Sequence, residues 1–570
     1  MAVELLGVDG ELKRVAEEAL TLRTNFAYTL DEVQTAMHRI FETGLFATCE
    51  PQADDTRDGS LPASAVREAL APLAGRPADF NALRAVSEKL NAWYDDNGYV
   101  GHITSCALSD ATGQVLLHTS EPRVASVRLR FEDRKTGEVK EEGQTRPDII
   151  LRHLNTQVGQ LYSLRRLEND LQSVLSTGLF EDAVFLPQPA ESSTVEAPRV
   201  DVTLLMREKR SGVLSAGTGV LASGRGGAAG AGEGAAPSQP SLGAAASIPS
   251  FMGQLQYNQR NLFGLGQRLQ ALVELGQANS NFSFVHEDPW VLGDAHRTAR
   301  TVALSSNRLP ADAVFGAAPG SPALAEGPPG AVHVARLGGS IEWTRPLGVG
   351  WTGSLALGWQ RATSLDERGR RVLHDRYAAP LHLGGRDRDT KATGTLRLSY
   401  APSSGQGQVV GSMEQAVPLQ ADWLNSNKFT LKADRALRLG PCSLWVGAKG
   451  GVVVGDLPPY DAFTIGGTNS VRGYDEGGVG TGRQFVVAST ELQVPLIAPL
   501  AGVLFADYGT DFESGAHVLG DPAGARGKPG RGYGAGAGLR LQTPIGPVRL
   551  ECAWNDAGVP RFHLGIGARD

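Results

Sequence analysis

The C-terminal part of the chain alternates apolar and polar residues with a period of two, and this pattern constrains the fold more than any other feature. It is clear in "RLQALVELG", "KATGTLRLSY", "KFTLKADRALRL", "PVRLECAWN" and "RFHLGIGA", where one face is apolar and the other carries charged or polar residues. Such alternation predicts β-strands with two unlike faces. It leaves open whether the polar faces meet solvent, as in a sandwich, or line the lumen of a membrane barrel.

The joins between these segments separate the two alternatives. About sixteen segments lie between residues 212 and 568, and short joins such as "NLFGLG", "PLGVG", "SSGQ" and "TPIG" alternate with long ones. The long joins lie at 224–249, 310–331, 365–389, 456–484 and 512–531. An even strand count with short turns on one rim and long loops on the other is typical of outer-membrane barrels.

We therefore predict an all-β transmembrane antiparallel barrel over residues 211–570. The first strand leaves the N-terminal part of the chain, so strand parity places that part at the short-turn rim. The same parity makes 456–484 the loop between the eleventh and twelfth strands, on the long-loop rim. No run of about eighteen apolar residues occurs, so we expect no transmembrane helix.

The N-terminal third contains a repeated helix. "TLDEVQTAMHRIFETGLF" (29–46) and "SLRRLENDLQSVLSTGLF" (163–180) align without a gap and carry apolar residues at amphipathic-helix spacing. Gly44 and Gly178 stand where a left-handed cap ends a helix, and a looser third copy ends at Gly98. The complete unit reads β-α-α-β-β, and "RPDIILRHLNTQVGQ" before the last copy is predicted to be its first helix. The helix pair is expected to cover one face of a small sheet and to leave one strand edge exposed.

The repeat sets the predicted domain boundaries. Gly98 and Gly178 are 178 − 98 = 80 residues apart, but Gly44 and Gly98 only 98 − 44 = 54. The strands between the first two copies are therefore expected to be missing or very short. We predict a partial unit at 1–58, a shortened unit at 59–120 and a complete unit at 121–210.

Several function classes are not expected. A net charge of −7 without a basic stripe argues against nucleic-acid binding. The four cysteines are far apart and have no histidine cluster near them, so neither a disulfide framework nor a metal site is expected. Histidines and carboxylates occur singly, so we expect no enzyme and no cofactor. The N-terminus matches neither a signal peptide nor a transit peptide, so we expect either that targeting is internal or that this start is not that of the native precursor.

The loop segment "SVRGYDEGGVG" (470–480) places one arginine among glycines. A phosphate cradle would need a following helix, whereas the strand "FVVASTELQVPL" follows; a plain connector and a charged plug remain. Glu491 and Asp507 fall on the polar faces of the next two strands. If the loop folds inward, Arg472 meets one of them in a planar pair worth on the order of 1.5 to 3 kcal/mol.

These motifs resemble a known superfamily. "VRGY" after "FTIGGTNS", together with Glu491 and "FADYG", is similar to the barrel motifs of the superfamily in which POTRA domains precede a sixteen-stranded barrel. The long run from "LFADYGTDFESG" to "PVRLECAWND" resembles its plastid outer-envelope branch, and within it the member thought to insert other barrels. The resemblance implies that Val471, Arg472, Gly473 and Tyr474 form a loop tip folded into the lumen, with Arg472 near Glu491 and Asp507.

The resemblance also implies a function. It predicts an integral protein of the plastid outer envelope in which POTRA units capture unfolded precursor or barrel proteins and the barrel inserts or passes them. Its seam would lie between the first strand and the last, where Gly565 and Gly567 weaken pairing. Other envelope translocation components and the lipid bilayer are the further expected partners. The alternatives are a protein-import channel of the same superfamily and a passive solute pore.

Overall fold

The computed structural model describes residues 61–71, 80–109, 114–194, 197–221, 250–276, 280–315 and 332–567, apart from 367, 376–378, 384–385, 403–404, 498, 521–523, 525 and 544–545. The chain divides into two compact units, residues 1–209 and 210–570. The partial unit predicted at 1–58, with the helix copy that ends at Gly44, lies outside the described residues. None of the described helices is both long and apolar enough to cross a membrane.

The first described part of the N-terminal unit consists of two helices followed by two strands. Helices α3 (Ala63–Leu70) and α4 (Phe80–Asn97) share a small core, and strands β1 (His102–Ser109) and β2 (Gln114–Ser120) pair antiparallel. The α4 helix ends where Gly98 adopts a φ of +71°, the left-handed conformation expected from the Asn-Gly sequence. No strand precedes α3 among the residues described from 61 onward.

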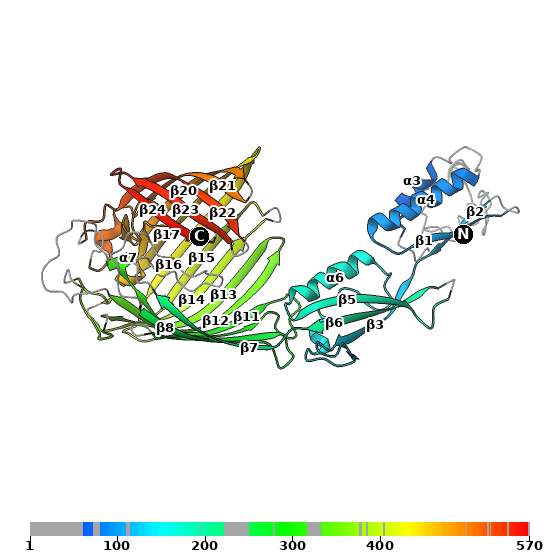
Figure 1. The fold of residues 1–570 in the computed structure, drawn as a ribbon, viewed down its shortest axis with the longest axis horizontal. Coiled ribbons are helices and arrows are strands. Elements are labelled where there is room, and N and C mark those ends of the chain that lie inside the picture. The colour runs from blue at the N-terminus through cyan, green and yellow to red at the C-terminus, as the bar shows by residue number, and fades with distance from the viewer. Residues whose placement is uncertain are drawn as a thin grey trace, which may run out of the picture. The chain divides into compact units, whose positions relative to one another are not determined.

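The second part of this unit is a four-stranded sheet with helices. Its elements are β3 (Arg123–Glu132), β4 (Val139–Lys140), α5 (Pro147–Leu151), α6 (Leu164–Ser176), β5 (Phe180–Pro189) and β6 (Arg199–Glu208). The strand order is β4-β3-β6-β5; β3 runs parallel to β6, and β5 runs antiparallel to it. Buried residues of α5, α6 and the sheet form one core, so the helices cover one face while β5 stays at the edge (Figure 1).

Helix α6 begins and ends as its sequence predicts. The hydroxyl of Ser163 accepts a hydrogen bond from the backbone N–H of Arg166, and Gly178 has a φ of +70° after the last turn. By contrast, the helix expected over "RPDIILRHLNTQVGQ" ends at Leu151. The reason is Asp170 of α6, which is buried and accepts the backbone N–H groups of Asn155 and Thr156 at 2.8 and 2.9 Å. These bonds hold the segment after α5 in a non-helical path.

The C-terminal unit is a sixteen-stranded antiparallel sheet, which confirms the predicted fold class and strand number. Its strands follow one another in chain order around the curved sheet (Figure 1). They are β7 (Gly212–Leu221), β8 (Ser250–Leu262), β9 (Gln267–Gly276), β10 (Ser280–Asp288), β11 (Ala299–Pro310), β12 (His333–Gly348), β13 (Trp351–Leu365), β14 (Asp389–Tyr400), β15 (Gly407–Val417), β16 (Ser426–Leu439), β17 (Cys442–Gly455), β20 (Gln484–Ile497), β21 (Leu500–Thr510), β22 (Arg531–Thr543), β23 (Gly546–Asn555) and β24 (Pro560–Ile566). Within the described residues the end strands β7 and β24 do not pair with each other.

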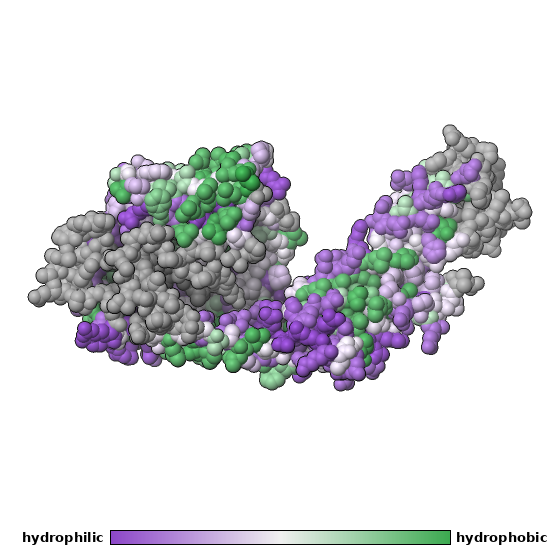
Figure 2. Space-filling view, viewed as in Figure 1, coloured by the Kyte–Doolittle hydropathy of each residue, from purple (hydrophilic) through white to green (hydrophobic). Residues whose placement is uncertain are grey.

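The two faces of the sheet differ as the alternation predicts. Large apolar side chains point outward and are exposed, such as Leu355 and Leu357 of β13, which are 48% and 51% exposed. Figure 2 shows such apolar residues in green over the outer wall of the barrel. Charged side chains such as Lys391 and Glu414 point into the lumen, where they pair. An apolar exterior around a polar interior is the arrangement of a barrel that spans a membrane.

By strand parity the five predicted long joins connect strand ends at one rim, but three other joins depart from the alternation. On that rim the join between β9 and β10 spans only residues 277–279 and the join between β23 and β24 only 556–559, whereas on the short-turn rim the join between β10 and β11 extends over 289–298. The longer turn folds on itself. The indole N–H of Trp290 donates to the carbonyl of Asp294, and the Asp294 carboxylate pairs with Arg345 of β12 at 2.9 Å.

Candidate functional site

The loop between β17 and β20 folds into a compact hairpin inside the barrel. Its short helix η3 (Pro459–Asp461) leads into β18 (Phe463–Ile465), which pairs antiparallel with β19 (Gly480–Gly482). Between these strands lies the segment 466–479, which includes the predicted loop tip, residues 471–474. As expected from strand parity, this loop joins the eleventh and twelfth strands of the sheet.

The root of the loop is held by the wall formed by β12, β14 and β15. Asp461 pairs with Arg336 of β12 at 3.0 Å and with Lys391 of β14 at 3.1 Å, and Lys391 also pairs with Glu414 of β15 at 2.9 Å. The hydroxyl of the neighbouring Tyr460 donates to the carboxylate at the start of β14. Asp461 lies outside the predicted loop tip, and no periodicity of the sequence links it to Arg336 or Lys391.

The tip of the loop is held by a different wall, formed by β20 to β24. Arg472 is completely buried and donates Nε to Oδ2 of Asp507 at 2.7 Å and Nη2 to Oδ1 at 2.9 Å. Its Nη1 donates to Glu491 at 2.8 Å. The structure therefore brings Arg472 together with both carboxylates that the sequence proposed as its partners, and the pair with Asp507 is bidentate.

A third carboxylate completes this cluster. Glu551 of β23 accepts from Nη1 of Arg472 at 3.1 Å, and Arg540 of β22 donates to the second oxygen of Glu491 at 2.8 Å. The alternation of "PVRLECAWN" places Glu551 on the polar face of its strand, but that residue lies 79 positions from Arg472 and nothing in the sequence joins them. The guanidinium also lies over the ring of Phe505, 3.4 Å from its centroid.

Backbone contacts add to the side-chain contacts at the tip. The N–H of Gly473 donates to Nε2 of His563 at 3.0 Å, and the side-chain amide of Asn555 donates to the carbonyl of Gly473 at 3.2 Å. Because Nε2 accepts, His563 carries its hydrogen on Nδ1, which lies 3.2 Å from the hydroxyl of Thr468. Gly473 has a φ of +94°, a conformation that residues with a side chain rarely adopt.

The two flanking tip residues pack in different ways. Val471 is completely buried in an apolar cluster with residues such as Ile465 and Val487. Tyr474 touches the same cluster and directs its hydroxyl to the carboxylate of Asp556 after β23. Each residue of the predicted tip thus contacts either the barrel wall or the hairpin core, so the loop is seated along its length rather than through one ion pair.

The two predicted seam glycines lie at the end of the last strand. Gly565 is within β24, where a Cβ would approach the guanidinium of Arg549 to 2.8 Å. Gly567 is the first residue after β24 and has a φ of +98°. Gly565 is therefore in contact with the neighbouring strand β23, and Gly567 lies at the chain's exit from the sheet.

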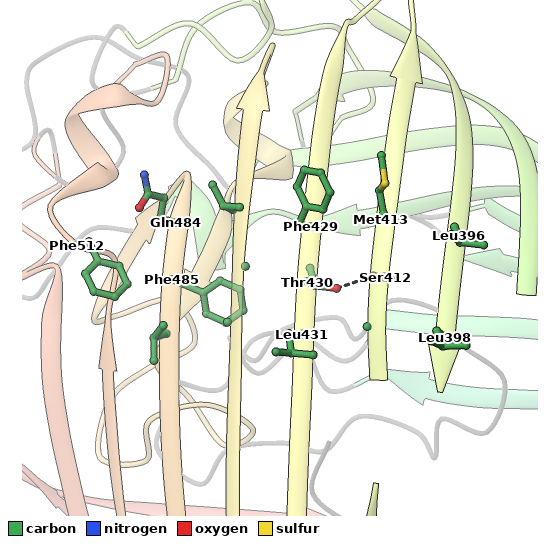
Figure 3. Close-up of a pocket in the computed structure, with 15 residues that line it drawn as sticks. Leu396, Leu398, Ser412, Met413, Phe429, Thr430, Leu431, Gln484, Phe485 and Phe512 are labelled. Atoms are coloured by element: carbon green, nitrogen blue, oxygen red, sulfur yellow. Dashed lines mark hydrogen bonds between the residues drawn. The ribbon is translucent and has the colours of Figure 1, made fainter. Parts of the chain in front are cut away.

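No metal site is found among the described residues, where no group of three or more histidine, cysteine or acidic side chains could hold an ion. Cys442 and Cys552 are free thiols. An apolar groove of about 510 Å³ lies on the outer wall across β14 to β20, with Leu396, Met413 and Phe429 among its lining residues (Figure 3). No charged side chain lines it, and its polar lining residues are Ser412, Thr430 and Gln484.

Comparison with known proteins places these features in a family context. Residues 261–569 match the family described as the Omp85 superfamily domain. Outer envelope protein 80, chloroplastic, of Arabidopsis thaliana is 38% identical, over 99% of this chain and 76% of that protein. The protein of the same name from Oryza sativa subsp. japonica is 36% identical, over 100% of this chain and 85% of its own length.

Two more distant matches extend the comparison. Protein TOC75-3, chloroplastic, of Arabidopsis thaliana is 26% identical, over 85% of this chain and 60% of that protein. Among solved structures, BamA from Haemophilus ducreyi lacking POTRA domains 1–3 matches with a TM-score of 0.56 and 16% identity, over 90% of this chain and 96% of that one. At that identity the match supports the fold alone.

Proposed function

The chain belongs to the Omp85 superfamily, and on that premise we propose that it is an integral insertase of the chloroplast outer envelope. In this proposal the N-terminal unit captures unfolded precursor or barrel proteins and the barrel assembles them into the membrane. The activity consists of making and breaking hydrogen bonds between strands, so it requires no cofactor.

The observation that carries this proposal is the seam between the first and last strands. β7 and β24 end the sixteen-stranded sheet, and within the described residues neither pairs with the other. An unpaired strand edge presents a row of N–H and C=O groups that another strand can join. A client strand that added to such an edge would have its backbone groups satisfied while it enters the hydrocarbon.

We propose that the Arg472 cluster acts as a latch for the loop in the lumen. Hydrogen bonds to charged groups contribute about 1.5 to 3 kcal/mol each, but desolvation of buried ions offsets much of this gain. The docked loop is therefore held firmly and can still be released. The three carboxylates that hold Arg472 lie on β20, β21 and β23, and β23 pairs with the seam strand β24. Loop position and seam geometry are therefore coupled in this proposal.

We also propose that the edge strand β5 is the place where clients bind the N-terminal unit. β5 is the last strand of its sheet, and Val184 and Leu186 on it are 43% and 42% exposed. An extended segment of an unfolded protein would pair with the free edge and cover these apolar side chains. Other translocation components of the envelope are further partners in this proposal.

Two alternatives remain from the sequence. A protein-import channel of the same superfamily is the closer one, because it would use the same barrel and the same N-terminal unit. A passive solute pore needs an open lumen, and the buried hairpin 456–483 with its two anchors speaks against it.

Site-specific crosslinking tests the proposal. A photoreactive amino acid is placed at Leu214 of β7 or Phe562 of β24, which are 67% and 63% exposed. The matched control is Leu431 of β16, which is 57% exposed on a wall away from the seam. We expect newly imported outer-envelope barrel precursors to crosslink at both seam positions and not at Leu431.

The crosslinked proteins discriminate the three functions. Barrel precursors at the seam support the insertase. Crosslinks to soluble precursors in transit, without barrel precursors, would identify an import channel. Equal or absent crosslinking at the three positions would contradict a seam function and leave the pore as the better description.

A further inference from the structure

The half of β22 next to the long-loop rim carries no side chains on its lumen face. Its inward positions from the long-loop rim are four glycines in alternation, whereas Tyr533 and Ala535 between them point outward. The four are Gly532, Gly534, Gly536 and Gly538. A strand interior with glycine at every second position is destabilised relative to one with side chains, so this row requires a structural reason.

Two of these glycines are in contact with the loop tip. A Cβ built on Gly534 would lie 1.7 Å from the carbonyl oxygen of Arg472, and its three nearest atoms are all backbone atoms of Arg472. A Cβ on Gly532 would lie 2.6 Å from the hydroxyl oxygen of Tyr474, and its nearest atoms all belong to that side chain.

The other two glycines have a different reason. The nearest atom to a Cβ on Gly536 would be the carbonyl oxygen of Cys552 at 2.0 Å, and for Gly538 it would be that of Leu550 at 2.6 Å. Both carbonyls belong to the neighbouring strand β23, so these two glycines allow the close approach of the β22 and β23 backbones. Gly532 and Gly534 differ because their closest contacts come from the loop.

The contacts follow the two-residue period of a strand. Arg472 lies over Gly534, and Tyr474, two residues later, lies over Gly532, two residues earlier, so the tip runs antiparallel across β22. We propose that Gly532 and Gly534 form a seat that sets the position of the loop tip along the wall and thereby places the Arg472 guanidinium among its three carboxylates. Gly534 and Gly532 are positioning residues in this proposal. The seat concerns where the loop lies; only its effect on client insertion rests on the proposed function.

The chemistry of the contacts predicts unequal effects of a single methyl group. At Gly534 the opposing atoms are backbone atoms, which cannot move without shifting the tip away from the wall. At Gly532 they are the far end of one side chain, which can rotate. Gly534→Ala is therefore expected to displace the loop more than Gly532→Ala.

Limited proteolysis of the full chain in lipid vesicles tests the seat. The variants are Gly534→Ala and Gly532→Ala, with Gly394→Ala as the control, because a Cβ on Gly394 of β14 would meet only Leu357 at an ordinary 3.9 Å. Folding of each barrel is checked by its heat-modifiable mobility on a gel. Trypsin can cleave after Arg472 only when this buried residue becomes exposed. The rate of this cleavage is measured by mass spectrometry of the fragment that ends at Arg472.

We expect cleavage after Arg472 to be at least about tenfold faster in Gly534→Ala than in the parent, because cleavage follows the population of the open loop. Gly532→Ala should give a smaller increase and Gly394→Ala none. Parental resistance in a folded Gly534→Ala variant would overturn the proposal. The readout involves no client, so it is independent of the insertase proposal.

A chain with a shortened loop provides a second test if Gly534→Ala does not fold in the full chain. Ile465 of β18 lies opposite Gly480 of β19, so a two-residue Asn-Gly turn can replace 466–479 and close this hairpin. In that shortened chain, Gly534→Ala should fold to the same yield as its parent, since the loop tip is gone. A folding defect that persisted there would show that Gly534 serves the sheet alone and would overturn the seat.

Discussion

Arg472 and Asp507 meet inside the barrel through two parallel hydrogen bonds, Nε to Oδ2 at 2.7 Å and Nη2 to Oδ1 at 2.9 Å, with both side chains removed from solvent. The backbone N–H of Arg472 adds a third bond to the same carboxylate at 3.2 Å. This relationship fixes the direction of the guanidinium as well as its position, because a bidentate pair has one planar geometry.

Replacing the arginine should release the loop and leave the barrel intact. Arg472→Ala leaves Asp507, Glu491 and Glu551 without their shared cation, and losing one partner of a buried ion pair costs about 3–5 kcal/mol. We expect a heat-modifiable, folded barrel in which hydrogen exchange rises sharply in peptides covering 466–479. Exchange unchanged from the parent would contradict the latch.

Exchanging the two charges should restore part of the docking. Arg472→Asp alone adds a fourth carboxylate to the cluster and should be worse than Arg472→Ala. Combined with Asp507→Arg, it returns a guanidinium to the same place, within reach of Glu491 and Glu551. Hydrogen exchange of the loop tip in the double variant should lie between the parent and Arg472→Asp. No recovery would indicate that the orientation of the original pair, rather than its charge, holds the loop.

Neutralising the three acids should have graded effects. Asp507 accepts three bonds from Arg472, Glu491 accepts one and also pairs with Arg540, and Glu551 accepts one at 3.1 Å. Exchange at 466–479 should therefore increase most in Asp507→Asn, less in Glu491→Gln and least in Glu551→Gln. A reversed order would show that the hydrogen bonds do not determine docking.

The loop root should open independently of its tip. Asp461→Asn removes the charge shared by Arg336 and Lys391, while the tip contacts are on another wall. In this variant the rate of hydrogen exchange should rise in peptides covering 456–465 and stay low at 471–474. The reciprocal variant Arg472→Ala should show the opposite pattern. Simultaneous opening of both segments in either variant would mean that the loop docks as one cooperative piece.

In the N-terminal unit, Asp170 should be the residue that holds the segment after α5. Its carboxylate accepts four bonds, from the backbone and side chain of Asn155 and of Thr156. Asp170→Ala leaves the N–H groups of Asn155 and of the buried Thr156 without this acceptor, at a cost on the order of 3 kcal/mol. Hydrogen exchange should increase at 152–160 and remain unchanged in the barrel. Glu168→Ala, two positions away on the exposed side of α6, is the matched control.

Part of the site could be predicted from sequence because its residues are close in the topology. Glu491 and Asp507 lie on the two strands that follow the loop, so alternation alone placed them on the lumen side within reach of Arg472. Glu551 is three strands further on, and Asp461 pairs with Arg336 and Lys391, 125 and 70 residues earlier in the chain. Their contacts depend on barrel curvature and on how far the loop folds inward, which periodicity does not encode.

The glycine pattern of β22 is evident in the sequence, but the sequence does not indicate what packs against these glycines. "RGYGAGAG" shows glycine at every second position, which predicts a face without side chains. What lies against that face follows only from the docked loop. Likewise, "RPDIILRHLNTQVGQ" predicts a longer helix than α5, because the acceptor that holds the following segment, Asp170, belongs to another helix.

The central claim is that this barrel inserts other barrels and that the docked loop supports the insertion. The most direct measurement is the folding rate of a urea-denatured chloroplast outer-envelope barrel precursor added to lipid vesicles, read from its heat-modifiable band. We expect vesicles that contain the parent protein to accelerate folding well above empty vesicles, and vesicles with Arg472→Ala to lie between them. Equal folding rates in empty vesicles and in vesicles with the parent protein would contradict the account.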